Sequence, residues 1–286
     1  MAHDHGERRR LGVVLGGGGV RGLAHAGVLA ALDRAGVHPS VIVGVSMGAV
    51  VGATYAARED WAAALEAVDR THLPAFTDPR ENEGLELVRA AVRSARRLAP
   101  TFWTWGRQGY EEYGRATLNQ LLGPVTTFAD TRIRLGMVAT DLYAGERVVL
   151  TEGDLVSATL ASAAIPGLAK PVELNGHILV DGGFADPAPI DVARELGADV
   201  VLAVYTGQHL RPSVTDNWLL ALLRGLEIGQ RKFAEERLGR ADMVLRPDFS
   251  KRVNVLNFSV IDDVVSCGVA CGRANADAVR ALIESG

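Results

Sequence analysis

Short apolar runs alternate with helical patterns over the first 58 residues, and this alternation restricts the possible folds more than any other feature. The runs at 11–15 and 41–45 are apolar throughout apart from glycine, as expected for strands that are buried on both faces. Each run is followed by a helical pattern, at 20–34 and at 47–58. Strands joined through helices in this way are typical of a parallel sheet covered by helices. The sequence therefore predicts an α/β fold with a mostly parallel central sheet.

The rest of the chain continues this alternation. Further strands are expected at 132–139, 146–151, 177–180 and 199–205, and further helices at 155–164, 190–196, 219–238 and 264–283. The chain has 286 residues, 48% of them hydrophobic, and its sequence contains no linker or repeat. These properties predict a single domain over residues 10–286. The polar and charged residues 1–9 are predicted to form a disordered tail.

Composition and charge exclude several classes of protein. The 30 basic and 34 acidic residues give a net charge of −4, whereas a nucleic-acid-binding domain usually carries a strongly basic face, so no nucleic acid partner is expected. The apolar run after Arg8 to Arg10 is too short for a signal peptide, and no run reaches the length of about 18 residues that a membrane span needs. The only cysteines, Cys267 and Cys271, lack the further ligands that a metal site requires. We therefore expect a soluble, cytoplasmic protein with reduced thiols.

The segment Gly44-Val45-Ser46-Met47-Gly48 places a serine between a predicted strand and a predicted helix. In so tight a turn, a side chain at either flanking glycine would clash with neighbouring backbone. Ser46 is thereby pushed out at the end of the strand, at the positive end of the following helix, where an alkoxide is least unfavourable. We interpret Ser46 as a nucleophile supported by Gly44 and Gly48. The simpler alternative is a serine that only caps the helix.

A run of glycines occupies the turn after the first strand, in the segment 16–22. The run satisfies the G-x-G-x-x-G pattern of dinucleotide-binding proteins, but the acidic residue that this pattern requires is missing from the end of the second strand, at 43–46. A P-loop is excluded because no Gly-Lys-Ser/Thr follows. Consecutive glycines at a helix start can instead direct their backbone N–H groups toward an anion next to the nucleophile. The residues predicted to form or brace such an oxyanion hole are Gly17, Gly18, Gly19 and Arg21.

Histidine, the usual base of a serine hydrolase, is poorly placed in this chain. The seven histidines lie in the predicted tail, inside a helix, in turns or loops, or at a strand start: His3, His5, His25, His38, His72, His177 and His209. Only His209 comes late enough for the residue order of an ordinary α/β-hydrolase, and its surroundings are typical of a surface loop. The sequence therefore favours a base other than histidine.

Asp181 is a better candidate for the base. It ends a predicted strand, and Gly182 and Gly183 allow the chain to turn sharply after it. A carboxylate at the end of a strand would reach the carboxyl edge of the sheet, where Ser46 also lies, and could accept the serine proton. The alternative is a turn aspartate that binds its own backbone. Weaker candidates for the base are Asp141, Asp186 and Asp191.

Four blocks, taken together and in order, resemble the patatin-like phospholipase family, especially its compact bacterial members. The blocks are Gly17-Gly18-Gly19-Val20-Arg21-Gly22, Gly44-Val45-Ser46-Met47-Gly48, Ala161-Ser162-Ala163-Ala164-Ile165-Pro166 and Asp181-Gly182-Gly183. The resemblance implies a three-layer α/β/α fold, a Ser–Asp dyad, an oxyanion hole from the glycine block, lipid acyl hydrolase activity and no metal or other cofactor. It also implies that Ser162 and Pro166 support the site. The chain departs from the pattern at Asp186, where such proteins often carry asparagine, and we assign that residue no role.

The segment 88–110 matches none of these blocks and has a distinctive composition. It contains five arginines and no acidic residue: Arg89, Arg93, Arg96, Arg97 and Arg107. The first four arginines are followed by the aromatic residues Phe102, Trp103 and Trp105. Basic residues followed by aromatic ones suit peripheral contact with an anionic membrane, or a lid over an apolar acyl site. An ordinary solvated helix followed by a packed aromatic turn is an equal alternative.

The expected substrate is an acyl ester of a lipid, with a phospholipid or lysophospholipid favoured over a small ester. The expected reaction proceeds through an acyl-Ser46 intermediate. Two alternatives stay open: a thioesterase or acyltransferase that uses the same pair on another acyl donor, and a regulatory binding protein with negligible hydrolysis.

Overall fold

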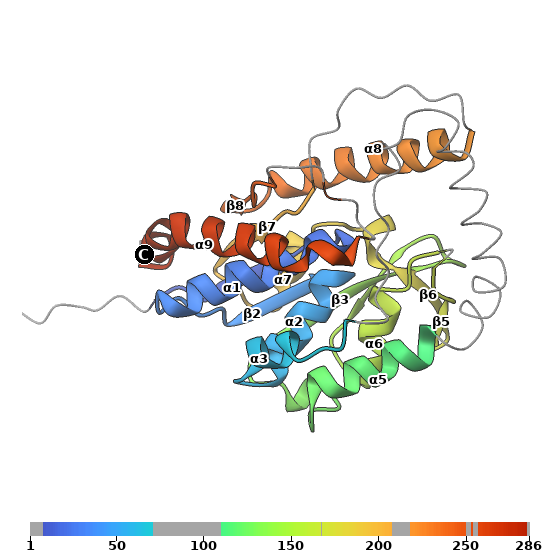
Figure 1. Ribbon diagram of the computed structural model, residues 1–286, viewed down its shortest axis with the longest axis horizontal. Coiled ribbons are helices and arrows are strands. Elements are labelled where there is room, and N and C mark those ends of the chain that lie inside the picture. The colour runs from blue at the N-terminus through green and yellow to red at the C-terminus, as the bar shows by residue number, and fades with distance from the viewer. Residues whose placement is uncertain are drawn as a thin grey trace, which may run out of the picture.

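The predicted strands at 11–15 and 41–45 lie side by side in the middle of one eight-stranded sheet (Figure 1). The computed structural model describes residues 8–70, 110–166, 168–207, 218–249, 253 and 257–284. In that part of the chain the strands are β1 (Leu11–Leu15), β2 (Val41–Val45), β3 (Arg134–Asp141), β4 (Arg147–Leu150), β5 (Val172–Leu174), β6 (His177–Asp181), β7 (Val200–Val204) and β8 (Met243–Leu245).

The sheet is parallel in its centre and antiparallel at one end. Its strand order is β5-β6-β3-β2-β1-β7-β8, and β4 also pairs with β3. Strands β3, β2, β1, β7 and β8 run parallel to one another, whereas β4 and β6 run antiparallel to β3, and β5 runs antiparallel to β6. The prediction of a mostly parallel central sheet is confirmed. The three-residue strands β5 and β8 were not predicted, because an apolar pattern needs more residues than these strands contain.

The helices follow the predicted pattern closely. In the described residues they are α1 (Ala24–Arg34), α2 (Met47–Ala57), α3 (Trp61–Glu66), α5 (Tyr110–Leu122), α6 (Leu155–Ser162), α7 (Ile190–Glu195), α8 (Trp218–Leu238) and α9 (Ile261–Glu284). Two short 3₁₀ helices adjoin the functional region: η1 (Gly19–Leu23), which precedes α1, and η5 (Gly182–Phe184), which follows β6. No helix in the described ranges is both long enough and apolar enough to cross a membrane.

The central strands send alternate side chains into two apolar cores. In β1, Val13 and Leu15 lie in the core formed with α1, α2 and α9, whereas Val14 lies in the core formed with α7 and the end of α8. Strand β2 divides in the same way, with Ile42 in the first core and Val43 in the second. Because the centre of the sheet is covered on both faces, β1 and β2 are apolar without a polar side. The three-layer α/β/α arrangement is confirmed.

Glycines allow α1 and α9 to approach until their backbones touch, and Figure 1 shows the two helices side by side. A Cβ atom added to Gly27 of α1 would lie 2.1 Å from the carbonyl oxygen of Val265, and one added to Gly268 of α9 would lie 2.0 Å from that of Ala24. The same helix α9 carries Cys267 and Cys271, which are both free thiols. The small residues thus set the distance at which the C-terminal helix covers α1.

Two predicted segments fall largely outside the described residues. They are the tail, of which residues 1–7 are not described, and the arginine-rich segment 88–110, of which only Tyr110 is described.

The close contact of α1 with α9 predicts a specific sensitivity to added volume. Gly268→Ala would force a methyl group into the backbone of α1, and overpacking of this kind typically costs about 1–3 kcal/mol. Gly229→Ala in α8 is the matched control, because nothing lies within 4 Å of the added Cβ and alanine favours a helix. We expect a lower midpoint of urea unfolding for Gly268→Ala and an unchanged or higher one for Gly229→Ala. Equal midpoints for the two variants would contradict the proposed packing.

Candidate active site

Strands β2 and β6 meet end to end along one edge of β3. Strand β2 pairs with β3 as far as Val45 opposite Val138, and β6, which runs the other way, ends with Asp181 opposite Ala139. Strand β4 pairs with residues 137–140 on the other edge of β3, so β2 and β6 must share the remaining edge. Asp181 therefore lies at the position along β3 that follows the end of β2. The residue that follows β2 is Ser46, where the chain turns out of the sheet, so Ser46 and Asp181 lie at the same place along β3.

Ser46 occupies a strained turn between β2 and α2. Its backbone angles are φ 56° and ψ −123°, in a region that residues other than glycine rarely adopt. Both flanking glycines are required: a Cβ on Gly44 would lie 2.5 Å from the Gly48 oxygen, and one on Gly48 would lie 2.0 Å from the Leu15 oxygen. The turn has the geometry expected of the motif and places the buried Ser46 at the N-terminus of α2.

The Asp181 carboxyl group is buried and surrounded by neutral donors. The Ser46 hydroxyl lies within hydrogen-bonding reach of it, and the N–H of Gly183 donates to its Oδ1 atom at 2.8 Å. Burial raises the pKa of Asp181 to about 6, and the hydrogen bonds from Ser46 and Gly183 offset only part of that rise. A carboxylate with this pKa is a stronger base than an exposed one and is still ionised at neutral pH.

Ser162 bridges the junction between the strand ends. Its buried hydroxyl donates to the Val138 carbonyl at 2.7 Å and accepts the N–H of Ser46 at 3.1 Å. The side chain thus satisfies two backbone groups that the turn of the chain at Ser46 would otherwise leave unpaired. In the same block, the Ala164 carbonyl accepts the N–H of Asp181 at 2.9 Å, whereas Pro166 forms an isolated bridge with Ala169.

The glycine loop packs directly against the serine turn. A Cβ on Gly17 would lie 3.4 Å from that of Ser46, and a Cβ on Gly22 would lie 2.6 Å from that of Met47. Gly19 has a positive φ of 56°, which favours glycine, and the N–H of Arg21 donates to the Gly18 carbonyl at 3.2 Å and closes the turn. The loop therefore lies beside Ser46, and Ser46 lies beside the end of β6 at Asp181.

The three histidines of the described residues pair with groups other than Ser46 and Asp181. His25 is fully buried and contacts the Gly16 carbonyl, His38 pairs with Asp33 at the surface, and His177 pairs with Asp141 at 2.6 Å. The other four, His3, His5, His72 and His209, lie outside the described residues. No group of three or more potential metal ligands occurs in the part of the chain that the structure describes.

Comparison with known proteins assigns this arrangement to a family. A family model described as patatin-like phospholipase matches residues 13–194, which include the glycine loop, the serine turn and the Asp181 turn. The chain belongs to the patatin-like phospholipase family. The matched region is thus the part of the chain that carries all four sequence blocks.

Relatives within and around this family differ widely in length. The uncharacterized NTE family protein Rv1063c of Mycobacterium tuberculosis is 34% identical over 227 residues, which cover 75% of this chain and 56% of the relative. Lysophospholipase nte1 of Aspergillus fumigatus is 31% identical over 214 residues, covering 73% of this chain and 12% of the relative. The crystal structure of VipD from Legionella pneumophila aligns with a TM-score of 0.46 and 14% identity, over 96% of this chain and 68% of that one. The chain therefore spans 56% of the length of the mycobacterial relative and 12% of that of the Aspergillus relative.

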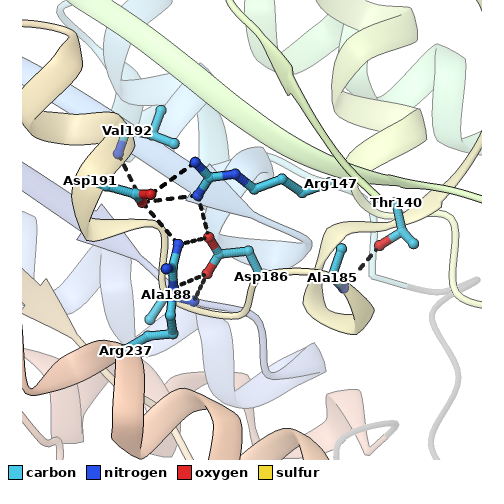
Figure 2. Close-up of polar contacts among 8 residues, drawn as sticks. All are labelled: Thr140, Arg147, Ala185, Asp186, Ala188, Asp191, Val192 and Arg237. Carbon is cyan, nitrogen blue, oxygen red and sulfur yellow. Dashed lines mark hydrogen bonds and ion pairs between the residues drawn. The ribbon is translucent and has the colours of Figure 1, made fainter. Parts of the chain in front are cut away.

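Asp186, the position at which the sequence departs from the family pattern, is the buried centre of a cluster of charged side chains (Figure 2). Its side chain is 1% exposed, and its carboxylate accepts hydrogen bonds from Arg147 of β4, Arg237 of α8 and the N–H of Ala188. Asp191 of α7 binds the same two arginines, at 2.8 Å and 2.9 Å. Two negative and two positive side chains thus close a ring that joins β4, α7, α8 and the loop after η5.

This cluster fixes the far end of the turn that begins at Asp181. At the near end, the Thr140 hydroxyl donates to the Asp181 carbonyl at 2.8 Å and accepts the N–H of Ala185 at 3.1 Å. At the far end, Asp186 is held by Arg147 and Arg237. From the sequence, Asp186 was assigned no role because it departs from the family pattern. Its two arginine partners could not be inferred, since they are distant in the sequence and no local pattern marks them.

Removal of the Asp186 carboxylate is expected to destabilise the protein strongly. Asp186→Ala would leave Arg147 and Arg237 with only Asp191 between them, and loss of one partner from a buried ion pair typically costs about 3–5 kcal/mol. The control Asp277→Ala removes an exposed partner of Arg280 and should leave the unfolding midpoint nearly unchanged. Chemical denaturation of the three proteins measures the difference. An equally small effect of both substitutions would mean that the ring does not hold the turn.

Proposed function

We propose that the chain is a serine lipid acyl hydrolase in which Ser46 is the nucleophile and Asp181 is its base. The observation that carries the proposal is the position of Ser46, in the strained turn after β2, next to the buried Asp181 carboxyl group at the end of β6, since the two strands end at adjacent residues of β3. Family membership supports hydrolysis of lipid esters as the reaction class. The glycine loop beside Ser46 supplies the third element of the site.

The proposed reaction has two steps. The Ser46 oxygen attacks the carbonyl carbon of the ester while Asp181 accepts the hydroxyl proton, and backbone N–H groups of Gly17, Gly18 and Gly19 stabilise the resulting oxyanion, with Arg21 bracing the loop. The bond between the acyl carbon and the alcohol oxygen then breaks, and Asp181 returns the proton to the leaving alcohol. In the second step, water attacks the carbonyl carbon of acyl-Ser46 while Asp181 accepts a proton from the water. The bond between the acyl carbon and the Ser46 oxygen then breaks, Asp181 returns the proton to Ser46, and the carboxylic acid is released.

The electrostatics of Asp181 suit this role. A carboxylate with a pKa near 4 is a weak base for a serine hydroxyl. Burial raises the pKa of Asp181 to about 6 and so narrows the difference between its pKa and that of the hydroxyl. The remaining difference between the pKa of Asp181 and that of the serine hydroxyl is large, so stabilisation of the oxyanion must supply much of the rate enhancement.

The proposed substrate class is a phospholipid or lysophospholipid. The family description and the name of the Aspergillus relative, lysophospholipase nte1, both support it. A thioesterase or acyltransferase would use the same chemistry on another acyl donor, and a binding protein would leave Ser46 unreactive. Incubation with a lipid extract, followed by mass spectrometry of the released acids and lysolipids, separates these outcomes.

Covalent labelling tests the two catalytic assignments. A fluorophosphonate probe should label the wild-type protein at Ser46 and should not label Ser46→Ala, because the probe reacts with an activated serine. Asp181→Asn should lower ester turnover about 10²–10⁴-fold, the usual contribution of a general base. Ser40→Ala, which removes an exposed serine before β2, is the control and should behave as wild type. Unchanged turnover in Asp181→Asn would rule out Asp181 as the base.

The pH dependence of turnover follows from the Asp181 environment. Only the ionised carboxylate can accept a proton, so kcat/KM should fall about tenfold per pH unit below the Asp181 pKa of about 6 and should level off above it. Steady-state rates on a soluble ester between pH 4.5 and 8.5, with protein stability checked at each pH, provide the profile. The profile should lose this inflection in Asp181→Asn. An inflection that persists in that variant would assign the titration to another group.

A further inference from the structure

Two consecutive carbonyl groups of the glycine loop are each bound by a buried side chain. The Nε2 atom of His25 lies 2.7 Å from the Gly16 carbonyl oxygen, and the Thr206 hydroxyl donates to the Gly17 carbonyl oxygen at 2.9 Å. Both side chains are completely buried. His25 belongs to α1, whereas Thr206 follows β7, the neighbour of β1 in the sheet, so the two contacts reach the loop from different parts of the fold.

The His25 contact is not explained by stability alone. A carbonyl oxygen only accepts hydrogen bonds, so Nε2 must carry the proton, and burial lowers the pKa of the ring to about 4, which keeps it neutral. The other ring nitrogen, Nδ1, is buried and has no hydrogen-bond partner among the described residues. Burial of such an unsatisfied polar atom is unfavourable for folding. An apolar side chain of similar size would avoid this cost, which indicates that the Nε2 donor serves another purpose.

Planarity of the peptide bond links these contacts to the neighbouring N–H groups. In a planar trans peptide the N–H of one residue points away from the C=O of the residue before it, and the described chain contains no cis peptide bond. A carbonyl of Gly16 held by His25 therefore fixes the direction of the Gly17 N–H. In the same way, a carbonyl of Gly17 held by Thr206 fixes the direction of the Gly18 N–H. Glycine peptides rotate easily, so these two directions would otherwise be poorly defined.

We infer that His25 and Thr206 are positioning residues that orient the N–H groups of Gly17 and Gly18 toward the oxyanion of the reacting ester. The inference rests on the proposed function, because it assigns those N–H groups to the oxyanion hole next to Ser46. It adds two residues that touch neither the substrate nor Ser46 and act only through the peptide planes of the loop. A donor that is already oriented needs no reorganisation when negative charge develops on the ester oxygen.

Paired substitutions separate donor loss from change of shape. His25→Met replaces the ring with an apolar chain of similar size, whereas His25→Gln retains an N–H donor at a comparable reach. Thr206→Val removes only the hydroxyl, whereas Thr206→Ser retains it. His38→Met, at an exposed histidine that pairs with Asp33, is the control for a histidine away from the site.

The measurement is kcat and KM on a soluble chromogenic ester, with the active fraction of each protein counted by fluorophosphonate labelling of Ser46. Loss of one oriented oxyanion donor typically lowers kcat about 10²–10³-fold, so a donor that is present but misdirected should cost about 10–100-fold. We expect this loss in His25→Met and Thr206→Val with KM within about threefold of wild type. His25→Gln and Thr206→Ser should recover most of kcat, and His25→Met should melt no earlier than wild type, because it removes the unsatisfied nitrogen. A purely structural role would lower the melting temperature and leave kcat per labelled site unchanged.

The possible failures are distinguishable. If kcat in the His25 and Thr206 variants does not depend on whether the hydrogen-bond donor is present, the positioning role is wrong while the hydrolase assignment stands. Where His25→Met or Thr206→Val does not fold, His25→Gln and Thr206→Ser provide the test. A change in KM alone would also overturn the positioning role. If wild-type protein neither labels at Ser46 nor turns over ester, the proposed function itself fails, and the inference fails with it.

Discussion

The shared edge of β3 is the constraint on which the rest of the site depends. Strands β2 and β6 arrive from opposite directions and end opposite two adjacent residues of β3, Val138 and Ala139. The chain must therefore leave the sheet twice within one residue step along β3. The two exits are the Ser46 turn and the Asp181 turn. A slip of one residue in either register would turn the side chain to the opposite face and separate the pair. Ser162 is found at this junction because two backbone groups there lose their strand partners.

Two buried carboxylates five residues apart have opposite environments, and this contrast separates chemistry from structure. Burial raises the pKa of Asp181, and the hydroxyl and the backbone N–H that approach its carboxylate lower it only in part. Asp186 is held by two guanidinium groups, which neutralise its charge and tie it to β4 and α8. A perturbed carboxyl group is suited to proton transfer, whereas a paired one anchors the loop that carries it. The strongly paired residue thus gives the poorly paired one a fixed position.

Local patterns were enough to predict the serine turn and the glycine loop, because strand, glycine spacing and helix follow one another directly in the sequence. Asp181 was predicted to lie near Ser46, but on the assumption that its strand opens at the carboxyl edge of a parallel sheet. Strand β6 is antiparallel to β3 and reaches the site from the other side, and no periodicity reveals strand direction. The partners of Asp186, at 147 and 237, and the contact of Thr206 with Gly17 were not predictable either, since they depend on pairings between distant segments.

The site is also built from residues beyond the family match, which ends at 194. Strand β7 pairs with β1 along its whole length and delivers Thr206 to the glycine loop. Helix α8 supplies Arg237 to the charge ring, and α9 covers α1, which carries His25. Without these elements β1 would lose one of its neighbouring strands and the loop one of its two carbonyl contacts. The C-terminal third, although it carries none of the four sequence blocks, therefore supplies contacts that hold the recognisable motifs in place.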